Sequence, residues 1–314
     1  MKIAVFDLGT NVFNMLLAEV DGSGRYAVIA EKKASAKIGE GIKDRFLTEE
    51  AYRRASRAIG ILVKEIKDNG GADHIAAYGT SALRDARNGS DFVRRLGEEH
   101  GFEITIIPGI REAELIYIGV RYALDKTDET FMILDIGGGS NEFIIADNSG
   151  ILWKQSFQLG MSRLRNIFTP SDPISPEETE KMLQHCDREL ADLWSAIERL
   201  QPKTLIGTSG SFDTFRDIIL GSYGNDGVSM EMSVEMLEEL FGRLIPSTRK
   251  ERESMPGMSE IRIDYITLAA IFTDFILKKT GIKKIYQSSF SLKEGGMAEF
   301  ANIKKINGYE TSDN

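Results

Sequence analysis

The chain has 314 residues, which is more than one hydrophobic core usually serves, and its 42% hydrophobic and 28% charged residues are ordinary for a folded protein. Its formal net charge of −9 argues against a nucleic-acid binder, because such proteins are usually basic. We therefore expect two domains and no nucleic-acid partner. A polyanion could still bind through a local group of cationic side chains and backbone N–H groups, or through a metal ion.

The first part of the chain is predicted to alternate strands and helices. Short apolar runs between turn residues indicate strands at 2–6, 13–20, 26–30, 74–78 and 103–107. Helical periodicity indicates helices at 48–69, 90–99 and 112–124. The first of these helices shows the period in Ala51, Ala55, Ile59, Leu62 and Ile66.

The second part begins again with strands, expected at 131–134, 142–147, 151–157, 204–206 and 282–287. Helices are expected at 176–200, 212–220, 234–244 and 265–279. The segment 125–130 between the two parts is the predicted boundary. It divides the chain into domains 1–124 and 125–314, with the C-terminal helix able to pack back on the first domain.

Two segments of the chain match each other without a gap. FDLGTNVFNMLLAE, from Phe6, aligns with LDIGGGSNEFIIAD, so that Asp7 falls on Asp135 and Gly9 falls on Gly137. Each copy is a strand, a glycine turn and a second strand, and a further strand follows. This repeat predicts a duplicated α/β domain, with the two halves facing each other across a cleft.

The two glycine turns differ from the common nucleotide-binding loops. A dinucleotide fold requires a helix directly after the turn, whereas strand-like residues follow here, and the lysine of a Walker loop is absent. Glycine hairpins bring backbone N–H groups close to an anion. The predicted phosphate-binding residues of the two turns are Gly9, Thr10, Asn11, Gly137, Gly138, Gly139, Ser140 and Asn141.

Asp7 and Asp135 end the strands that lead into these turns. A carboxylate beside a phosphate site would repel the ligand unless it holds a cation, and Mg²⁺ suits one or two carboxylates plus phosphate oxygens. The alternative is that aspartate and glycine only form tight turns. A third loop with Gly207, Ser209 and Gly210 precedes a predicted helix and is a further anion-site candidate, or simply a helix cap.

Cysteine and histidine add little chemistry. The chain has a single cysteine, Cys186, in a charged helical stretch, and a packing role is favoured over a nucleophile. The three histidines show no metal-ligand spacing. Nothing before Phe6 resembles a signal peptide, and no apolar run is long enough to cross a bilayer. We expect a reducing cytoplasm and no membrane partner.

The ordered motifs resemble those of the exopolyphosphatase and guanosine-pentaphosphate phosphohydrolase family, within the actin-like (ribonuclease H-like) ATPase superfamily. The resemblance extends over most of the chain. Its motifs are DLGTN at Asp7, KIGEG at Lys37, GTSALRDARN at Gly79, PGIREAELIYIGV at Pro108, DIGGGSNE at Asp135, GTSGS at Gly207, PGMSEIRID at Pro256 and SSFSLKEG at Ser288.

The resemblance implies Mg²⁺-dependent release of terminal phosphate from polyphosphate or guanosine pentaphosphate, with water as the nucleophile. It implies Glu112 as the general base, Glu142 as a second carboxylate that orients water or supports the metal, and Arg84 as a phosphate ligand. Without the resemblance, Glu112 would be read as an acid that complements a helix dipole, and Arg84 as a solvated charge. The resemblance is also compatible with a homodimer.

The chain departs from the family pattern in a few positions. Val12 and Asn14 stand where members usually have serine and histidine, and Lys293 stands where they have arginine. Val12 and Asn14 keep open a non-catalytic nucleotide or alarmone sensor, and a small-molecule kinase of the same superfamily is a further alternative. Further candidates for a basic channel, each with a surface-charge alternative, are Lys37, Arg163, Arg262 and Lys293.

Overall fold

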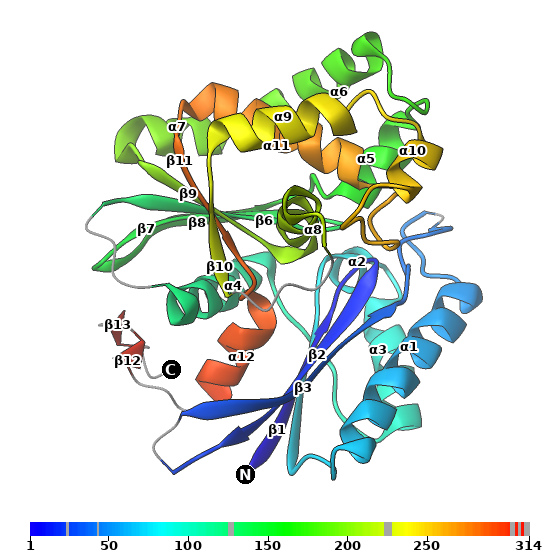
Figure 1. Cartoon of the computed structure of the whole chain (residues 1–314). Coiled ribbons are helices and arrows are strands. Elements are labelled where there is room, and N and C mark those ends of the chain that lie inside the picture. Colours follow the sequence, from blue (N-terminus) through cyan, green and yellow to red (C-terminus); the bar gives the residue numbers. More distant parts are fainter. Residues whose placement is uncertain are drawn as a thin grey trace. The chain divides into compact units, whose positions relative to one another are not determined.

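The structure is a computed structural model that describes residues 1–22, 25–42, 44–124, 129–222 and 228–301, and the backbone of 305–306 and 309–310. The chain forms two compact units, Met1–Tyr122 with Phe290–Asn314, and Ala123–Ser289. Residues 125–128 of the expected boundary lie outside the described residues. Each unit combines a mixed sheet with helices, so the predicted α/β class of actin-like domains is confirmed (Figure 1).

The first unit contains a sheet of order β3-β2-β1-β4-β5. Its strands are β1 (Lys2–Leu8), β2 (Val12–Val20), β3 (Tyr26–Ser35), β4 (His74–Gly79) and β5 (Thr105–Ile106). The first three strands form an antiparallel meander, and β4 and β5 add to β1 in parallel. The predicted strands are all present, although β3 extends to Ser35 and β5 is shorter than expected.

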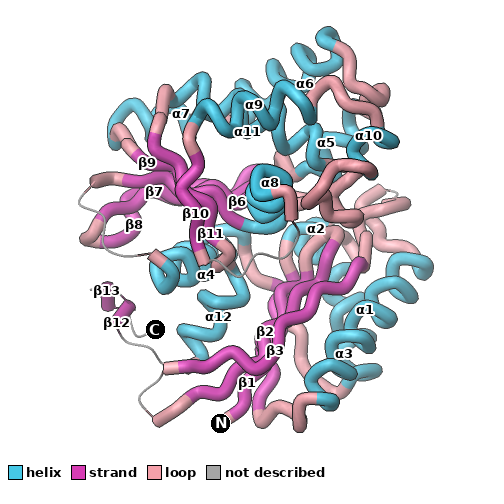
Figure 2. The backbone as a smooth tube through the Cα atoms, in the orientation of Figure 1, coloured by secondary structure: helices cyan, strands magenta, loops and turns pink. Residues whose placement is uncertain are grey.

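Helices cover both faces of this first sheet (Figure 2). They are α1 (Glu49–Asp68), α2 (Ser81–Asp85), α3 (Gly89–His100), α4 (Gly109–Ala123) and α12 (Leu292–Phe300). The buried side of α1 packs with α3 on the face that carries Phe6 and Phe13. Because side chains alternate along a strand, Ile3 and Val5 point to the other face, where α12 packs through Met297.

The second unit contains a sheet of order β10-β11-β9-β6-β7-β8. Its strands are β6 (Phe131–Ile136), β7 (Asn141–Asp147), β8 (Gly150–Phe157), β9 (Thr204–Thr208), β10 (Ser229–Met232) and β11 (Lys284–Ser288). An antiparallel meander, β6-β7-β8, is again extended by parallel strands, β9 and β11. The edge strand β10 was not predicted. Short strands β12 (Lys305–Ile306) and β13 (Tyr309–Glu310) form a separate hairpin.

The helices of the second unit are α5 (Met161–Phe168), α6 (Pro176–Glu189), α7 (Ala191–Leu200), α8 (Ser209–Leu220), α9 (Val234–Leu244), α10 (Arg249–Glu253) and α11 (Ile266–Thr280). The single helix predicted at 176–200 is wrong, because α6 ends before Leu190 and α7 starts after it. The Trp194 indole donates to the Asp187 carbonyl at 3.1 Å, which satisfies one carbonyl at the end of α6.

The predicted repeat is present in the backbone of both meanders. The Gly9 amide donates to the Val12 carbonyl at 3.2 Å, and the Gly137 amide donates to the Ser140 carbonyl at 3.1 Å. In the strand pairs, Asp7 lies opposite Asn14, and Asp135 lies opposite Glu142. The two glycine turns are therefore equivalent hairpins in the two units.

Three aromatic rings mark where the chain leaves and re-enters the first unit. Tyr122 is the last residue of the first pass, and Phe290 is the first residue of the return. The Tyr122 ring stacks on Tyr26 at a centroid distance of 5.0 Å and on Phe290 at 6.2 Å. Both connections thus begin from one aromatic stack.

Candidate active site

The carbonyl side of the first glycine turn is closed by the loop after β3. The amides of Ala36 and Lys37 donate to the Asn11 carbonyl at 2.9 and 2.8 Å, and the Gly39 amide donates to the Thr10 carbonyl at 3.3 Å. The side chains of Thr10 and Asn11 are buried. These bonds fix the peptide planes of the turn from behind.

The second glycine turn is fixed in the same manner by α5, a helix that sequence reasoning missed. Backbone N–H groups of 160–163 donate to carbonyl oxygens of 137–139 at distances from 2.8 to 3.3 Å. The amide nitrogens of 138–140 have no acceptor among the described residues. A Cβ on Gly160 would lie 2.4 Å from backbone atoms of the turn, so this close approach requires glycine.

Asp135 and the third loop are brought together at the end of β6. The Ser209 hydroxyl donates to Oδ2 of Asp135 at 2.6 Å. Ser209 has a φ of +69°, which is unusual for a residue with a side chain and is typical of strained functional loops. Across the hairpin, Glu142 is buried, and the Ser156 hydroxyl donates to its Oε1 at 2.6 Å.

The remaining glycines of the third loop have different roles. A Cβ on Gly207 would lie 2.1 Å from the Phe212 ring, so Gly207 makes room for the core of the unit. A Cβ on Gly210 would lie 2.1 Å from Nη2 of Arg262, so the guanidinium group rests directly on this loop. Arg262 is thereby placed beside Gly210, a position that the sequence indicated only weakly.

Two polar residues of the second turn are buried. Asn141 is fully buried, and its amide donates to the Leu159 carbonyl at 2.9 Å, which holds the loop after β8. Ser140 is also buried. Arg163 of α5 donates through Nε to the Gly139 carbonyl at 2.9 Å, which adds a cation to the rear of the turn.

Asp7 of the first turn is held by the side chain opposite to it. Nδ2 of Asn14 donates to Oδ2 of Asp7 at 2.9 Å. Sequence reasoning noted Asn14 only as a departure from a family pattern, and nothing in the sequence alone indicated this contact. The amide therefore supports the carboxylate that was predicted to hold a metal ion.

Glu112 and Arg84 lie together in the first unit. Nη1 of Arg84 donates to Oε2 of Glu112 at 2.8 Å and to the Ile107 carbonyl at 3.0 Å. The Glu112 amide donates to the Pro108 carbonyl at 3.0 Å, which starts α4 earlier than expected. Nη2 of Arg84 is buried and has no hydrogen-bond partner among the described residues.

The other two candidates for a basic channel, Lys37 and Lys293, form ion pairs with nearby carboxylates. Lys37 forms an ion pair with Glu40 at 3.4 Å. Lys293 is mostly buried between Glu31, at 3.1 Å, and Glu294. Burial alone would lower the pKa of the Lys293 ammonium group, but the two carboxylates raise it above its usual value, whereas burial raises the pKa of Glu294. Lys293 therefore belongs to a buried ion pair of the first unit.

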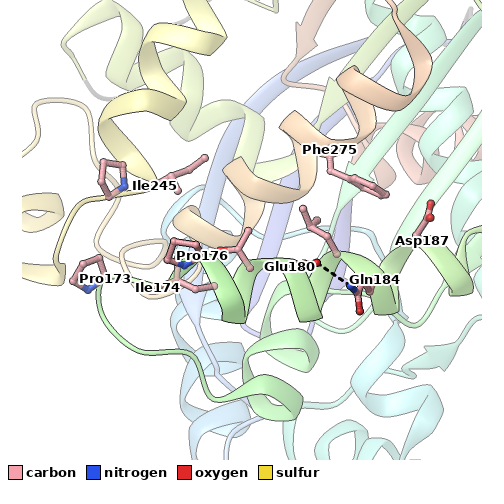
Figure 3. A pocket seen from close by; sticks show the side chains of 11 residues that line it. Pro173, Ile174, Pro176, Glu180, Gln184, Asp187, Ile245 and Phe275 are labelled. Carbon is pink, nitrogen blue, oxygen red and sulfur yellow. Dashed lines mark hydrogen bonds between the residues drawn. The ribbon is translucent and has the colours of Figure 1, made fainter.

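A cavity of about 740 Å³ in the second unit contains none of the predicted site residues (Figure 3). Its polar side chains, Thr179, Glu180, Gln184 and Asp187, come from α6. Its remaining lining residues are apolar, namely Pro173, Ile174, Pro176, Leu183, Ile245, Pro246 and Phe275. Because its described lining residues include no lysine or arginine, the cavity does not suit a polyphosphate chain.

Cys186 of α6 is fully buried, as its expected packing role requires, and burial raises the pKa of its thiol to about 12. Within the described part of the chain, no group of three or more histidine, cysteine and acidic side chains is arranged to hold a metal ion. Among the described helices, none is long and apolar enough to span a bilayer.

The fold and the paired aspartate–glycine hairpins define an α/β protein of the actin-like kind. The chain belongs to the Ppx/GppA phosphatase family, whose sequence pattern matches residues 16–302. It is therefore an enzyme of a hydrolase family. The matched residues include parts of both units.

Solved structures and curated relatives agree with this assignment. The crystal structure of an exopolyphosphatase from Cytophaga hutchinsonii is similar, with a TM-score of 0.92 and 34% identity over 98% of this chain and 99% of that one. Exopolyphosphatase 1 of Mycobacterium leprae is 24% identical over 94% of this chain and 87% of its own length. The guanosine-5'-triphosphate,3'-diphosphate pyrophosphatase of Aeromonas hydrophila is 24% identical over 93% of this chain, which spans 58% of that protein.

Proposed function

We propose that the protein is a Mg²⁺-dependent phosphoanhydride hydrolase that releases terminal phosphate from inorganic polyphosphate or guanosine pentaphosphate. The observation that carries the proposal is the second glycine turn. Its carbonyl groups are engaged by 160–163, while the amides of 138–140 have no acceptor among the described residues. Successive backbone N–H groups of this kind bind phosphate oxygens. The names of the Cytophaga hutchinsonii and Aeromonas hydrophila relatives support the two substrates.

Two carboxylates are assigned to the attacking water. Glu112 is the general base, because its carboxylate is held in one orientation by Arg84 and can accept a proton from water. Glu142 orients the water or supports the cation. Arg84 contributes Nη2, which has no partner among the described residues, to a phosphate oxygen.

Asp7 of the first unit and Asp135 of the second unit each supply a carboxylate that would hold Mg²⁺. This ion usually takes one or two protein carboxylates and completes its shell with water and phosphate oxygens. Carboxylate oxygens are hard ligands of the kind that Mg²⁺ takes from a protein, so the donor chemistry of Asp7 and Asp135 fits this ion. The bound ion would neutralise part of the phosphate charge.

A substrate panel tests the proposal. The protein is incubated with Mg²⁺ and, in separate reactions, long-chain polyphosphate, guanosine pentaphosphate or ATP, and free phosphate is measured. We expect release from polyphosphate or guanosine pentaphosphate without ATP, and loss of release on chelation of the metal. ADP formation that depends on an added acceptor would instead indicate a kinase. Saturable binding without hydrolysis would indicate a sensor.

A further inference from the structure

The two glycine hairpins are equivalent in backbone but differ in the residue opposite the aspartate. Asp135 lies opposite Glu142, whereas Asp7 lies opposite Asn14. Residues paired directly across antiparallel strands place their side chains on the same face, about 4.5–5.5 Å apart at Cβ. The second hairpin therefore presents two acids on one face, and the first presents one acid and one amide.

The side-chain amide of Asn14 is hydrogen-bonded to the carboxylate of Asp7. Nδ2 of Asn14 donates to Oδ2 of Asp7 at 2.9 Å, a normal length for a bond to a carboxylate. Asn14 is only partly buried, but Asp7 is connected through it to the next strand of the sheet. A neutral donor of this kind orients a carboxylate without removing its charge.

The next strand continues the difference between the hairpins. Asn14 pairs with Lys33 on β3, whereas Glu142 pairs with Ser156 on β8. The row of paired residues across the first hairpin, Asp7, Asn14 and Lys33, thus combines an acid with a base. The corresponding row across the second hairpin, Asp135, Glu142 and Ser156, contains two acids. A neutral row tolerates a phosphate group better than a row of two acids does.

We infer that Asn14 is a positioning residue for Asp7. It holds the Asp7 carboxylate toward a bound cation and keeps the first hairpin from becoming a second acid pair, so that the hairpin accepts the cation together with an anionic chain. This inference rests on the proposed role of Asp7 as a cation ligand.

Two substitutions of similar volume separate this role from a purely structural one. Asn14→Leu removes the donor, and Asn14→Asp replaces it with a second acid. Mn²⁺ binding to the substrate-free protein is measured by electron paramagnetic resonance, and kcat and KM for polyphosphate are measured with Mg²⁺. The control is Gln155→Leu, which removes another amide-to-carboxylate bond, from Gln155 to Asp192 at 3.3 Å. Asp7→Asn reports whether Asp7 binds the ion.

We expect Asn14→Leu to weaken Mn²⁺ binding about tenfold, as loss of a supporting hydrogen bond behind a metal ligand usually does. Asn14→Asp should tighten Mn²⁺ binding but raise KM for polyphosphate, and Gln155→Leu should change neither. If Asp7→Asn weakens Mn²⁺ binding while both Asn14 variants match the wild type or shift binding in the same direction, the inference about Asn14 is overturned. If Asp7→Asn leaves Mn²⁺ binding unchanged, the cation role of Asp7 fails, and this inference fails with it.

Discussion

Arg84 and Glu112 are joined by a 2.8 Å hydrogen bond from Nη1 to Oε2, although 28 residues separate them in the chain. The same nitrogen donates to the Ile107 carbonyl at 3.0 Å, so the arginine also fixes the loop that leads into α4. The proposed base is therefore held in place by the proposed phosphate ligand.

Replacement of Glu112 with glutamine should abolish turnover and keep the fold. The amide can still accept a bond from Arg84, but it cannot take a proton from water, and loss of a general base typically lowers the rate by about 10²–10⁴-fold. Phosphate release and the circular dichroism spectrum provide the measurements. The control is Glu114→Gln, two residues further along α4, which should change the rate less than about twofold. Full activity of Glu112→Gln would remove Glu112 from the mechanism.

Replacement of Arg84 with lysine should raise KM about tenfold, or about 1.4 kcal/mol of binding. The arginine uses Nη1 to donate to Glu112 and Ile107, and its second terminal nitrogen can donate to phosphate at the same time. The single ammonium group of lysine cannot make both sets of contacts. Steady-state kinetics with polyphosphate test this. Arg87→Lys, at an exposed residue shortly after α2, is the matched control and should leave KM unchanged. A wild-type KM for Arg84→Lys would contradict the phosphate role.

Alanine at Gly210 should reduce activity with little loss of stability. The added Cβ would meet the end of the flexible Arg262 side chain, which can move away at small cost but then leaves the loop. In contrast, Gly242→Ala on α9 meets no atom within 4 Å and should stabilise the helix by about 0.5–1 kcal/mol without an effect on activity. Thermal unfolding and phosphate release distinguish the two. A fully active Gly210→Ala protein would separate Arg262 from the site.

Ser209 allows backbone strain and hydroxyl chemistry to be tested separately. Glycine at this position relieves the strain of the positive φ, +69°, but removes the hydrogen bond to Asp135. Alanine removes the same hydrogen bond and keeps the strain. Ser209→Gly should therefore be more stable than Ser209→Ala by about 1 kcal/mol, measured by denaturant unfolding. Both should lose activity to a similar extent, because both lack the hydroxyl group that donates to Asp135. Equal stability of the two variants would show that the loop is not strained.

Cys186 predicts a pH effect on stability. Burial raises the pKa of its thiol from 9.0 to about 12, so between these values the unfolded chain loses the proton and the native protein keeps it. The unfolded state is then favoured, and the free energy of unfolding falls as pH rises above about 9. Cys186→Ala should show a shallower decline over the same range. The native thiol should also resist a disulfide reagent at pH 8 until the protein unfolds, and rapid native labelling would refute its burial.

The sequence predicted the strands of both meanders, their hairpins and the α/β class because apolar runs and glycine turns are local signals, but it missed the edge strand β10. The helix α9 was predicted with its observed bounds, Val234–Leu244. Helix α5 was missed because it is short and has no side-chain cap that would mark its start after Gly160. Its contribution to the second turn could not be predicted, since it depends on backbone groups that any sequence carries.

The candidate site was predicted less completely than the fold. The resemblance to known motifs identified Glu112 and Arg84, but their mutual contact depends on how α2 and α4 pack. The bond between Asn14 and Asp7 depends on strand register, and the position of Arg262 depends on a loop 52 residues further along the chain than Gly210. Such contacts arise from tertiary structure and have no local signature.

The stack of Tyr122 on Phe290 has a consequence for protein engineering. Residues 123–289 form one continuous insert, and both of its attachment points start from adjoining rings. A shortened chain in which a few glycines join Tyr122 to Phe290 would connect two residues whose rings already lie near each other. Such a chain would contain the first unit alone. The same geometry suits grafting, because a foreign module with closely spaced termini could be spliced in at that junction.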